Sequence, residues 1–239
     1  MENTIFIGLS RQMALRREMD VVANNLANMN TTAYKRQTVL FQEYLIDAGT
    51  EGESSYVIDF GLARDVTEGR LQKTDNPFDL AITGNGYLVV ETEEGPRYTR
   101  NGRLHLNEDG VLVASSGDPV MNQNGAEVTI SDADGAIEIA PDGTISTRLG
   151  IIGRLEVVTF QDMQALQPGA AGLYSTDEAP EPAPDVKIRQ GLLERSNVEP
   201  IVEMTNMINV LRSYQSSQKL LDTDHDLLRK AIDRLAAIR

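Results

Sequence analysis

The stretch VVANNLANMNTTAYKR, residues 21–36, constrains the fold more than any other part of the sequence. It places Asn24, Asn25 and Asn28 between small and apolar residues, although asparagine is a poor helix former whose amide competes for backbone hydrogen bonds. An asparagine at a packed helical position costs stability but fixes the register, because its amide must find one particular partner. The sequence alone is compatible both with specific contacts for these amides and with solvent-facing positions that have no role.

A long N-terminal helix is predicted to lead into this stretch. Residues 3–29 contain no proline and a single glycine, Gly8, and apolar residues recur along them at alternating spacings of four and three. This heptad pattern is typical of helices that pack on other helices. The turn-forming residues at 28–32 should end the helix. We assign the following residues to contacts between helices or subunits: Ile5, Leu15, Met19, Val22, Asn24, Asn25, Leu26 and Asn28.

A second long helix is predicted at the C-terminal end, beginning in the segment SNVEP. Ser196 and Glu199 fit a capping box. Alternatively, Asn197 is the cap and Pro200 falls in the first turn. No glycine or proline follows, and a better heptad pattern extends to the last residues. The predicted interface residues of this helix are Met207, Leu211, Tyr214, Leu221, Leu228, Ile232 and Leu235.

Between the two helices the pattern changes to short β-branched runs separated by turn dipeptides. Runs such as YLVV (87–90) and RLEVVTF (154–160) alternate with Asn-Gly and Asp-Gly pairs, which predicts antiparallel hairpins and an all-β domain. Residues 176–186 are acidic and proline-rich and should form an extended loop. Residues 33–75 fit either a short helix or a strand.

The predicted fold class is α+β, with long N- and C-terminal helices that pair as a coiled-coil-like helical domain and an inserted all-β antiparallel domain. Neither heptad seam can be buried on a distant β domain, so we expect the helices to become ordered only when subunits assemble. The expected divisions are 1–32 for the N-terminal helix, 33–75 for a connecting segment, 76–175 for the β-rich domain, 176–195 for the proline-rich loop and return segment, and 196–239 for the C-terminal helix.

The net charge of −14 lies entirely in the middle of the chain. Residues 37–194 carry ten basic against twenty-seven acidic side chains, whereas the two ends are close to neutral. Such an acidic middle should repel nucleic acid and anionic lipid. Cysteine is absent, which excludes disulfides and thiolate chemistry, and no apolar run suggests a membrane span or a cleavable secretory signal.

Four segments resemble motifs of one protein family, the rod and hook family of flagellar axial proteins. They are ANNLANMNTTAYKR (23–36), DNPFDLAITGNGYLVV (75–90), RYTRNGRLHLNEDGVLVASSGDPV (97–120) and LLERSNVEPIVEMTNMINVLRSYQSSQKLL (192–221). They occur in the order of the family, which makes the resemblance specific. The residues that carry it in the β domain are Asp79, Gly84, Gly86, Tyr98, Arg100, Asn101 and Gly102.

The resemblance implies a structural, self-assembling subunit of the bacterial flagellar basal body. In this family, terminal helices of many subunits would form a tube with the β domain outside, transmitting torque in the periplasmic rod. The short chain favours a proximal-rod subunit over a distal-rod or hook-type paralogue. The implied partners are other copies, other rod proteins and the flagellar type III export apparatus, which needs no cleaved signal peptide.

The residues single out no active site. Gly84-Asn85-Gly86 resembles a phosphate-binding loop, but a strand and not a helix should follow it, so a hairpin or bulge is favoured. His225 lies near three aspartates, where a metal is conceivable but a packed or partly exposed histidine is favoured. We therefore predict no enzyme, cofactor, metal, nucleic acid, small-molecule substrate or membrane insertion. The alternative is a β-rich ligand-binding module with a coiled-coil oligomerisation stalk.

Overall fold

A computed structural model describes residues 2–47, 53–131 and 135–236 of the 239-residue chain. The chain divides into two compact units. We call the first the helical unit, which comprises Met1–Ala27, Gln37–Asp65 and Glu199–Arg239. The second, the β unit, comprises Asn28–Arg36 and Val66–Val198.

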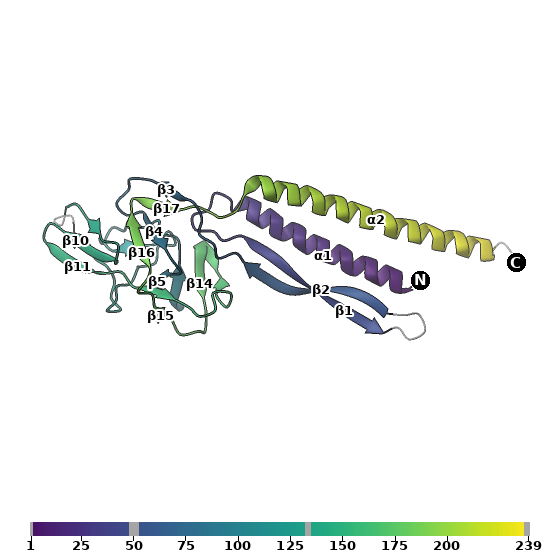
Figure 1. Cartoon of the computed structure of the whole chain (residues 1–239), viewed down its shortest axis with the longest axis horizontal. Coiled ribbons are helices and arrows are strands. Elements are labelled where there is room, and N and C mark those ends of the chain that lie inside the picture. The colour runs from purple at the N-terminus through teal and green to yellow at the C-terminus, as the bar shows by residue number, and fades with distance from the viewer. Residues whose placement is uncertain (1, 48–52, 132–134, 237–239) are drawn as a thin grey trace. The chain divides into compact units, whose positions relative to one another are not determined.

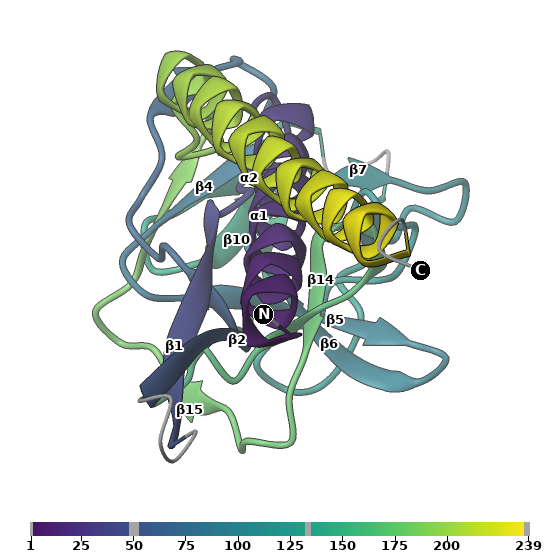
Figure 2. The same cartoon turned by 90° about the vertical axis from the view of Figure 1, so that its right-hand side faces the viewer.

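The helical unit contains two α-helices, α1 (Glu2–Ala27) and α2 (Pro200–Ala236), and a β-hairpin of β1 (Gln37–Asp47) and β2 (Glu53–Arg64). α1 lies between α2 and the hairpin and contacts both (Figure 1 and Figure 2). Gly8 lets the two helices approach, because a Cβ atom there would come within 2.6 Å of Leu221 Cδ2. No helix in the described part of the chain is long and apolar enough to cross a membrane.

The predicted coiled-coil-like pairing of the terminal helices is wrong, although the α+β class agrees with the structure. A coiled coil needs an apolar seam that repeats every seven residues on both helices. On α2 the buried positions include Glu203 and Ser217, which are polar, whereas Leu211 of the predicted seam is 42% exposed. α1 in turn divides its contacts between α2 and the hairpin, so the two helices do not form an exclusive pair.

The C-terminal end of α1 and the N-terminal end of α2 lie at residues that suit a helix boundary. α1 ends at Ala27, directly before the polar cluster. α2 begins at Pro200, whose missing N–H is tolerated at the first helical position. Asn197 does not cap α2, because its Oδ1 accepts a hydrogen bond from the Arg36 N–H at 2.7 Å.

The hairpin occupies most of the segment that the sequence left open between helix and strand. Its strands pair antiparallel from Gln37 opposite Arg64 to Asp47 opposite Glu53. The register shifts once, between Leu40 and Phe41, as in a β-bulge. A two-stranded ribbon of this kind is marginal by itself, so its packing on α1 contributes to its stability.

The β unit is antiparallel throughout its described pairings, as the turn dipeptides predicted. Its largest sheet has the strand order β13-β14-β6-β5-β12-β15. The smaller sheets are β11-β10-β9 and the two-stranded pairs β16-β4, β17-β3 and β7-β8. The strands are β3 (Leu71–Lys73), β4 (Leu80–Thr83), β5 (Tyr87–Thr92), β6 (Gly95–Thr99), β7 (His105–Leu106), β8 (Leu112–Val113), β9 (Glu138–Ile139), β10 (Thr144–Thr147), β11 (Gly150–Arg154), β12 (Val157–Thr159), β13 (Gln167–Pro168), β14 (Leu173–Ser175), β15 (Glu181–Pro182), β16 (Lys187–Gln190) and β17 (Leu192–Glu194).

Alternate residues of β5 enter two different apolar cores. Leu88 and Val90 belong to an aliphatic cluster, while Tyr87 and Val89 belong to a smaller aromatic cluster. This follows from the two-residue period of a strand, which sends successive side chains to opposite faces. The unbroken apolar run YLVV therefore marks a strand that is buried on both faces.

Candidate assembly surface and a buried ionic junction

Asn25 has a specific partner within the chain. Its side-chain Nδ2 donates to Gln37 O at 2.8 Å, and its Oδ1 accepts from the Gln37 N–H at 2.9 Å. The same Nδ2 lies 3.3 Å from Glu203 Oε2 of α2. One buried amide thus joins α1 to the start of β1 and to α2, which explains an asparagine in this helix.

The other two asparagines differ from Asn25. Asn24 is exposed on α1. Asn28 follows the last turn of α1: its backbone O accepts from the Thr31 N–H at 3.1 Å, and its Oδ1 accepts from the Thr31 hydroxyl at 3.0 Å. It therefore helps to end the helix, as expected of a residue that forms local turns.

The predicted interface residues fall into four groups by burial. Val22 and Asn25 are buried, and Asn24 and Leu211 are exposed. The half-buried ones are Leu15, Met19, Leu26, Asn28, Met207, Tyr214 and Leu221. The side chains of Ile5, Leu228, Ile232 and Leu235 lie outside the described part of the chain. Their role in contacts between subunits stays a prediction.

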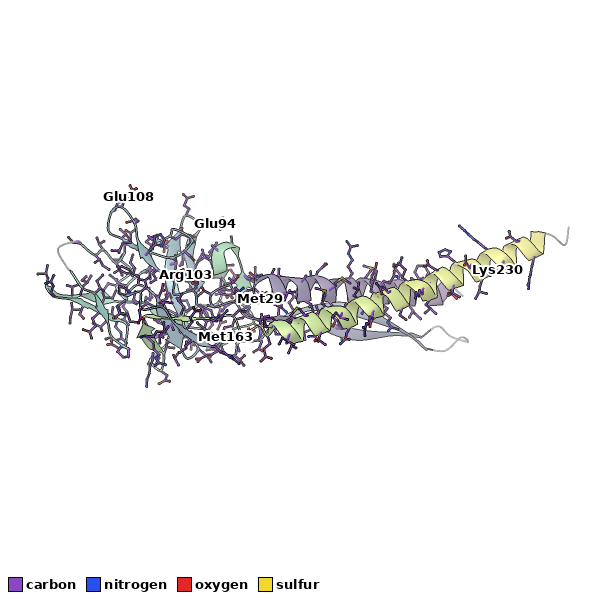
Figure 3. The ribbon with its side chains drawn as sticks, turned by 90° about the horizontal axis from the view of Figure 1, so that it is seen from above. Met29, Glu94, Arg103, Glu108, Met163 and Lys230 are labelled. Carbon is purple, nitrogen blue, oxygen red and sulfur yellow. The ribbon has the colours of Figure 1, made fainter. Side chains whose placement is uncertain are left out.

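Exposed apolar side chains mark a surface of which the heptad pattern named only Leu211. Ile201, Met204, Ile208 and Leu211 recur along α2 at spacings of three and four, which places them on one helix face. We call these four residues the outer stripe. Figure 3 shows side chains standing outward from α2 as far as Lys230. Further exposed apolar residues of the helical unit are Phe6, Leu9, Met13, Leu40, Phe41, Leu62, Val202, Leu220 and Leu227.

The glycines of the predicted β-domain motif allow close backbone contacts. Leu80 N–H donates to Gly102 O at 2.8 Å, and a Cβ atom on Gly102 would lie 1.8 Å from Leu80 O. Gly84 has a φ of +99°, a backbone angle that residues with a side chain rarely adopt. A Cβ atom on Gly86 would lie 2.8 Å from Val186 Cγ2. Since β5 follows directly, this Gly-Asn-Gly segment leads into a strand and not into a phosphate-binding helix.

The remaining motif residues make contacts within the β unit. Tyr98 packs edge to face on Phe160, with ring centroids 4.7 Å apart. Asn101 accepts from the Arg103 N–H at 3.1 Å. Asp79 is buried, and its backbone O accepts from the Gly191 N–H at 2.8 Å.

Arg100 belongs to a buried ionic junction with Lys35 and Glu194. Lys35 Nζ lies 2.6 Å from Glu194 Oε1, and Arg100 Nε lies 2.6 Å from Glu194 Oε2. Lys35 also donates to Thr67 O at 2.6 Å, and the Gly69 N–H donates to Glu194 Oε1 at 2.8 Å. Every side chain of this triad is at most 4% exposed.

The Arg100 guanidinium is satisfied on all sides. Its NH1 donates to Gly84 O at 2.7 Å and to Gly86 O at 3.2 Å, and its NH2 donates to Ile82 O at 3.1 Å. Glu68, which is partly exposed, lies 3.7 Å from NH2. A rigid fork of five donors suits this task, which a lysine could not perform.

Three families of flagellar proteins match separate parts of the chain. The family described as flagella basal body rod protein matches residues 5–35. The flagellar hook protein FlgE/F/G D1 domain matches residues 81–147. The flagellar basal body rod FlgEFG protein C-terminal family matches residues 189–234.

Relatives match over the whole length. The flagellar basal-body rod protein FlgF of Caulobacter vibrioides is 41% identical over 244 residues, which cover 100% of both chains. The chain belongs to the flagellar basal-body rod protein family. The FlgF of Mesorhizobium japonicum is 32% identical, covering 92% of each chain, and the FlgG of Bacillus subtilis is 29% identical, covering 98% of this chain and 99% of the relative. The predicted family is thus confirmed, and this rod protein is FlgF-like.

Each of the three matched segments of this rod protein supplies one member of the ionic junction. Lys35 lies in the N-terminal segment, Arg100 in the middle segment and Glu194 in the C-terminal segment. Sequence reasoning named Arg100 but neither Lys35 nor Glu194 as a site residue. The available signal was that all three lie within the motifs that carry the family resemblance.

The junction of the rod protein stabilises its glutamate as an anion. Burial by itself raises the pKa of Glu194, but the charges of Arg100 and Lys35, with the hydrogen bonds from Lys35 and Gly69, outweigh it and lower that pKa. Burial lowers the pKa of Lys35, and the charge of Glu194 opposes this effect only in part. The junction is enclosed and internally paired, so its chemistry is structural.

The histidine with neighbouring aspartates forms no metal centre in the described structure. His225 is exposed on α2. The described residues contain no group of three or more histidine, aspartate or glutamate side chains that could hold a metal ion.

Proposed function

We propose that this FlgF-like rod protein is a non-enzymatic, self-assembling subunit of the proximal flagellar rod. The observation that carries the proposal is the distribution of exposed apolar side chains. Among the described residues, all but three large apolar side chains with high exposure belong to the helical unit; the exceptions are Leu71, Leu149 and Ile151. Contiguous exposed apolar surface is typical of protein-protein contact sites.

Assembly gives these side chains a favourable environment. Burying one leucine, isoleucine or methionine fully contributes about 1.5–3 kcal/mol, so the four residues of the outer stripe could together stabilise a subunit contact substantially. The self-complementary contact of a closed dimer would end assembly, whereas contacts between different patches continue into a helical filament. A rod requires the second kind.

The finer parts of the proposal extend family membership. The subunit takes a proximal position, as its similarity to proteins named FlgF supports, and it contacts other copies and other rod proteins. It transmits torque in the periplasmic part of the basal body after export by the flagellar type III apparatus without cleavage of a signal peptide. The acidic β unit, with exposed carboxylates such as Glu94 and Glu108 (Figure 3), favours solubility on its outer surface.

A matched pair of double variants tests the assembly surface. In cells that carry only the variant chain, Ile208→Glu with Leu211→Glu should abolish both incorporation into isolated basal bodies and swimming. Each change places a charge in a contact that becomes buried on assembly. The control, Leu149→Glu with Ile151→Glu, alters two more exposed residues of the β unit and should leave incorporation intact.

Both variants should keep the circular dichroism and thermal transition of the unmodified chain, because the four altered side chains are exposed. Normal incorporation of the α2 variant would refute the proposed assembly surface. Absence of the unmodified chain from purified basal bodies would refute the proposed function itself.

A further inference from the structure

We infer that the outer stripe of α2 in one copy docks on an apolar stripe of α1 in a second copy, with the two helices antiparallel. The inference rests on the proposed function and names the two faces that meet and their relative direction. The contact is a short packing of two helix faces and requires no seven-residue repeat.

The second surface is an exposed apolar face near the beginning of α1. Phe6, Leu9 and Met13 recur at spacings of three and four, which places them on one helix face. They are 58%, 48% and 66% exposed, and we call these three residues the α1 stripe. Arg16 continues the same spacing and is also exposed. Arg11, the charged residue within this part of α1, falls on the opposite face at 3.6 residues per turn.

The two stripes match in spacing and in charge. The residues of the outer stripe follow one another at three, four and three positions, and the α1 stripe followed by Arg16 does the same. Neither stripe has a charged side chain on its exposed face, because Glu203, the charged residue among residues 201–211, is buried. A nucleic acid or an anionic lipid surface would meet no cation within these faces, whereas the uncharged apolar face of a second copy fits both.

The two stripes lie at opposite ends of the helical unit, because α1 and α2 are antiparallel within one chain (Figure 1). Gly8 lies against Leu221, and Asn25 Nδ2 lies 3.3 Å from Glu203 Oε2. The α1 stripe is therefore beside the middle of α2, whereas the outer stripe is near the beginning of α2. A contact between the stripes requires two copies that are displaced along the helices.

An antiparallel contact keeps all copies pointing in the same direction. When α1 of one copy runs against α2 of the next, the α1 helices of the two copies run in the same direction, because α1 and α2 are also antiparallel within each chain. Each copy then offers its α1 stripe to one neighbour and its outer stripe to another, so the series of contacts stays open. A parallel contact would reverse the second copy and let both pairs of stripes close into a dimer, which ends assembly.

The matched spacings define the register of the contact. Phe6 of one copy lies opposite Leu211 of the other, and the remaining stripe residues follow in order. Within one chain Gly8 lies at the level of Leu221. The docked copies are therefore displaced by about 12 residues, or roughly 18 Å along the helices at 1.5 Å per residue.

The flanking charges favour the antiparallel direction. In the antiparallel register Arg16 lies opposite Ile201, at the far end of the contact from Arg212. In a parallel register Arg16 would lie opposite Leu211 and beside Arg212, and like charges brought together destabilise a contact. Asp20, which is one turn further along the exposed face of α1, comes to the N-terminal end of α2 in the antiparallel case, where a negative charge is stabilising.

The contact is too small to hold two copies together in solution by itself. The seven side chains of the two stripes are 42–77% exposed and present several hundred Å² together, below the about 1,200 Å² at which isolated complexes become stable. We therefore expect the contact to form where the further subunits of an assembled rod add contacts of their own.

The absence of cysteine allows a direct test of the direction. Two full-length copies with different tags, one with Phe6→Cys and one with Leu211→Cys, are expressed together in cells that lack the unmodified chain. Oxidation of isolated basal bodies should give the mixed cross-linked dimer at roughly tenfold the yield of a second pair, Phe6→Cys with Ile201→Cys, since proximity raises the effective thiol concentration. Ile201 is 77% exposed and Leu211 42% exposed, so accessibility alone would favour the second pair.

An introduced charge pair supplies a second test of the same register. Met13→Glu should lower incorporation into basal bodies at least about fivefold, because it places a charge in an apolar contact. Met204→Arg in the same chain should restore incorporation, since Met204 of one copy lies opposite Met13 of the next. Ile208→Arg, which a parallel contact would place opposite Met13, should restore nothing.

Each outcome decides. If the chains enter basal bodies but the pair with Leu211→Cys cross-links no better than the pair with Ile201→Cys, the docking is overturned and the proposed function stays intact. Rescue of Met13→Glu by Ile208→Arg, or by neither arginine, overturns the docking as well. Absence of the unmodified chain from purified basal bodies overturns the proposed function and the docking together. Unchanged circular dichroism of each variant excludes misfolding as the cause.

Discussion

The two units of this rod protein differ in their unfavourably placed side chains: the β unit buries charged ones, and the helical unit exposes apolar ones. The β unit encloses even a charged triad, Lys35, Glu194 and Arg100, and pairs each charge inside one chain. The helical unit leaves apolar residues such as Ile201 and Phe6 in solvent at 77% and 58% exposure. The difference fits the proposed assembly, in which neighbouring subunits cover the exposed apolar side chains of the helical unit.

The charged triad gives the β unit its most sensitive point. A buried ion pair contributes little net stability compared with an apolar replacement, but removal of one partner leaves an uncompensated buried charge. Glu194 is the shared partner of two cations, so its removal leaves both without their anion. We therefore expect the largest loss of stability in the β unit when this residue is replaced.

Glu194→Gln should lower the free energy of unfolding of the β unit by about 3–5 kcal/mol. The amide keeps the size of the side chain but leaves Lys35 and Arg100 without their anion. Urea denaturation followed by segment-resolved amide hydrogen exchange measures the loss in β4 and β5 separately from α1. The control Glu108→Gln changes an exposed acid in a turn and should stay within about 0.5 kcal/mol of the unmodified protein. Equal stabilities for the two variants would show that the triad does not stabilise the β unit.

Gly102→Ala should have the next largest effect on the β unit. It should lower the free energy of unfolding by about 3 kcal/mol, the upper end of the range for overpacking. The added Cβ atom would lie 1.8 Å from Leu80 O, so the backbone of β4 must move. Gly153→Ala is the matched control, because its Cβ atom would have its nearest neighbour at 3.8 Å and needs no shift. Thermal unfolding of both variants checks the difference, and a Gly102 variant as stable as the Gly153 variant would contradict the close packing.

Local patterns in the sequence predicted the elements of the fold better than their partners. Long runs with no internal proline and at most one glycine identified both helices, and turn dipeptides identified the antiparallel strands. The hairpin was left open because QTVLFQEYLID has no turn dipeptide directly after it and suits a helix or a strand. The buried face of α2 was misplaced because it includes the polar residues Glu203 and Ser217, which a search for apolar heptad positions passes over.

The ionic junction could not be assembled from sequence spacing. Lys35 and Glu194 are 159 positions apart, and neither carries a local signal of burial. Charged residues are mostly exposed, so the default expectation for each was the surface. Arg100 was noticed through family resemblance, but its role follows only from the carbonyls of Ile82, Gly84 and Gly86 that surround it.

Asn25→Ala tests the helical unit. It should lower the free energy of unfolding by about 1–3 kcal/mol, because buried polar groups lose a hydrogen-bond partner. The substitution removes both hydrogen bonds to Gln37 and the contact with Glu203. Hydrogen exchange should rise at Gln37 and in the middle of α2 and stay unchanged in the β unit. Asp20→Ala, at an exposed position of α1, should change stability by less than about 0.5 kcal/mol. If both variants behave alike, Asn25 does not join the three elements.

Acid should weaken the β unit, with a pH dependence to which Glu194 contributes. Because the folded-state pKa of Glu194 is lowered from 4.5, its stabilisation is present above that ordinary pKa and is lost as the pH falls through the lower folded value. One proton taken up on unfolding corresponds to at most about 1.4 kcal/mol per pH unit.

Urea titrations of the β unit at a series of pH values below 4.5 measure this slope. The Glu194→Gln variant should lose that part of the pH dependence, because it removes the Glu194 carboxyl group. The Glu108→Gln variant retains Glu194 and should keep it. An identical slope in all three proteins would assign the acid sensitivity to surface carboxylates. A slope confined to the proteins that retain Glu194 would show that this buried charge, which is paired entirely within one chain, contributes to the stability of the β unit.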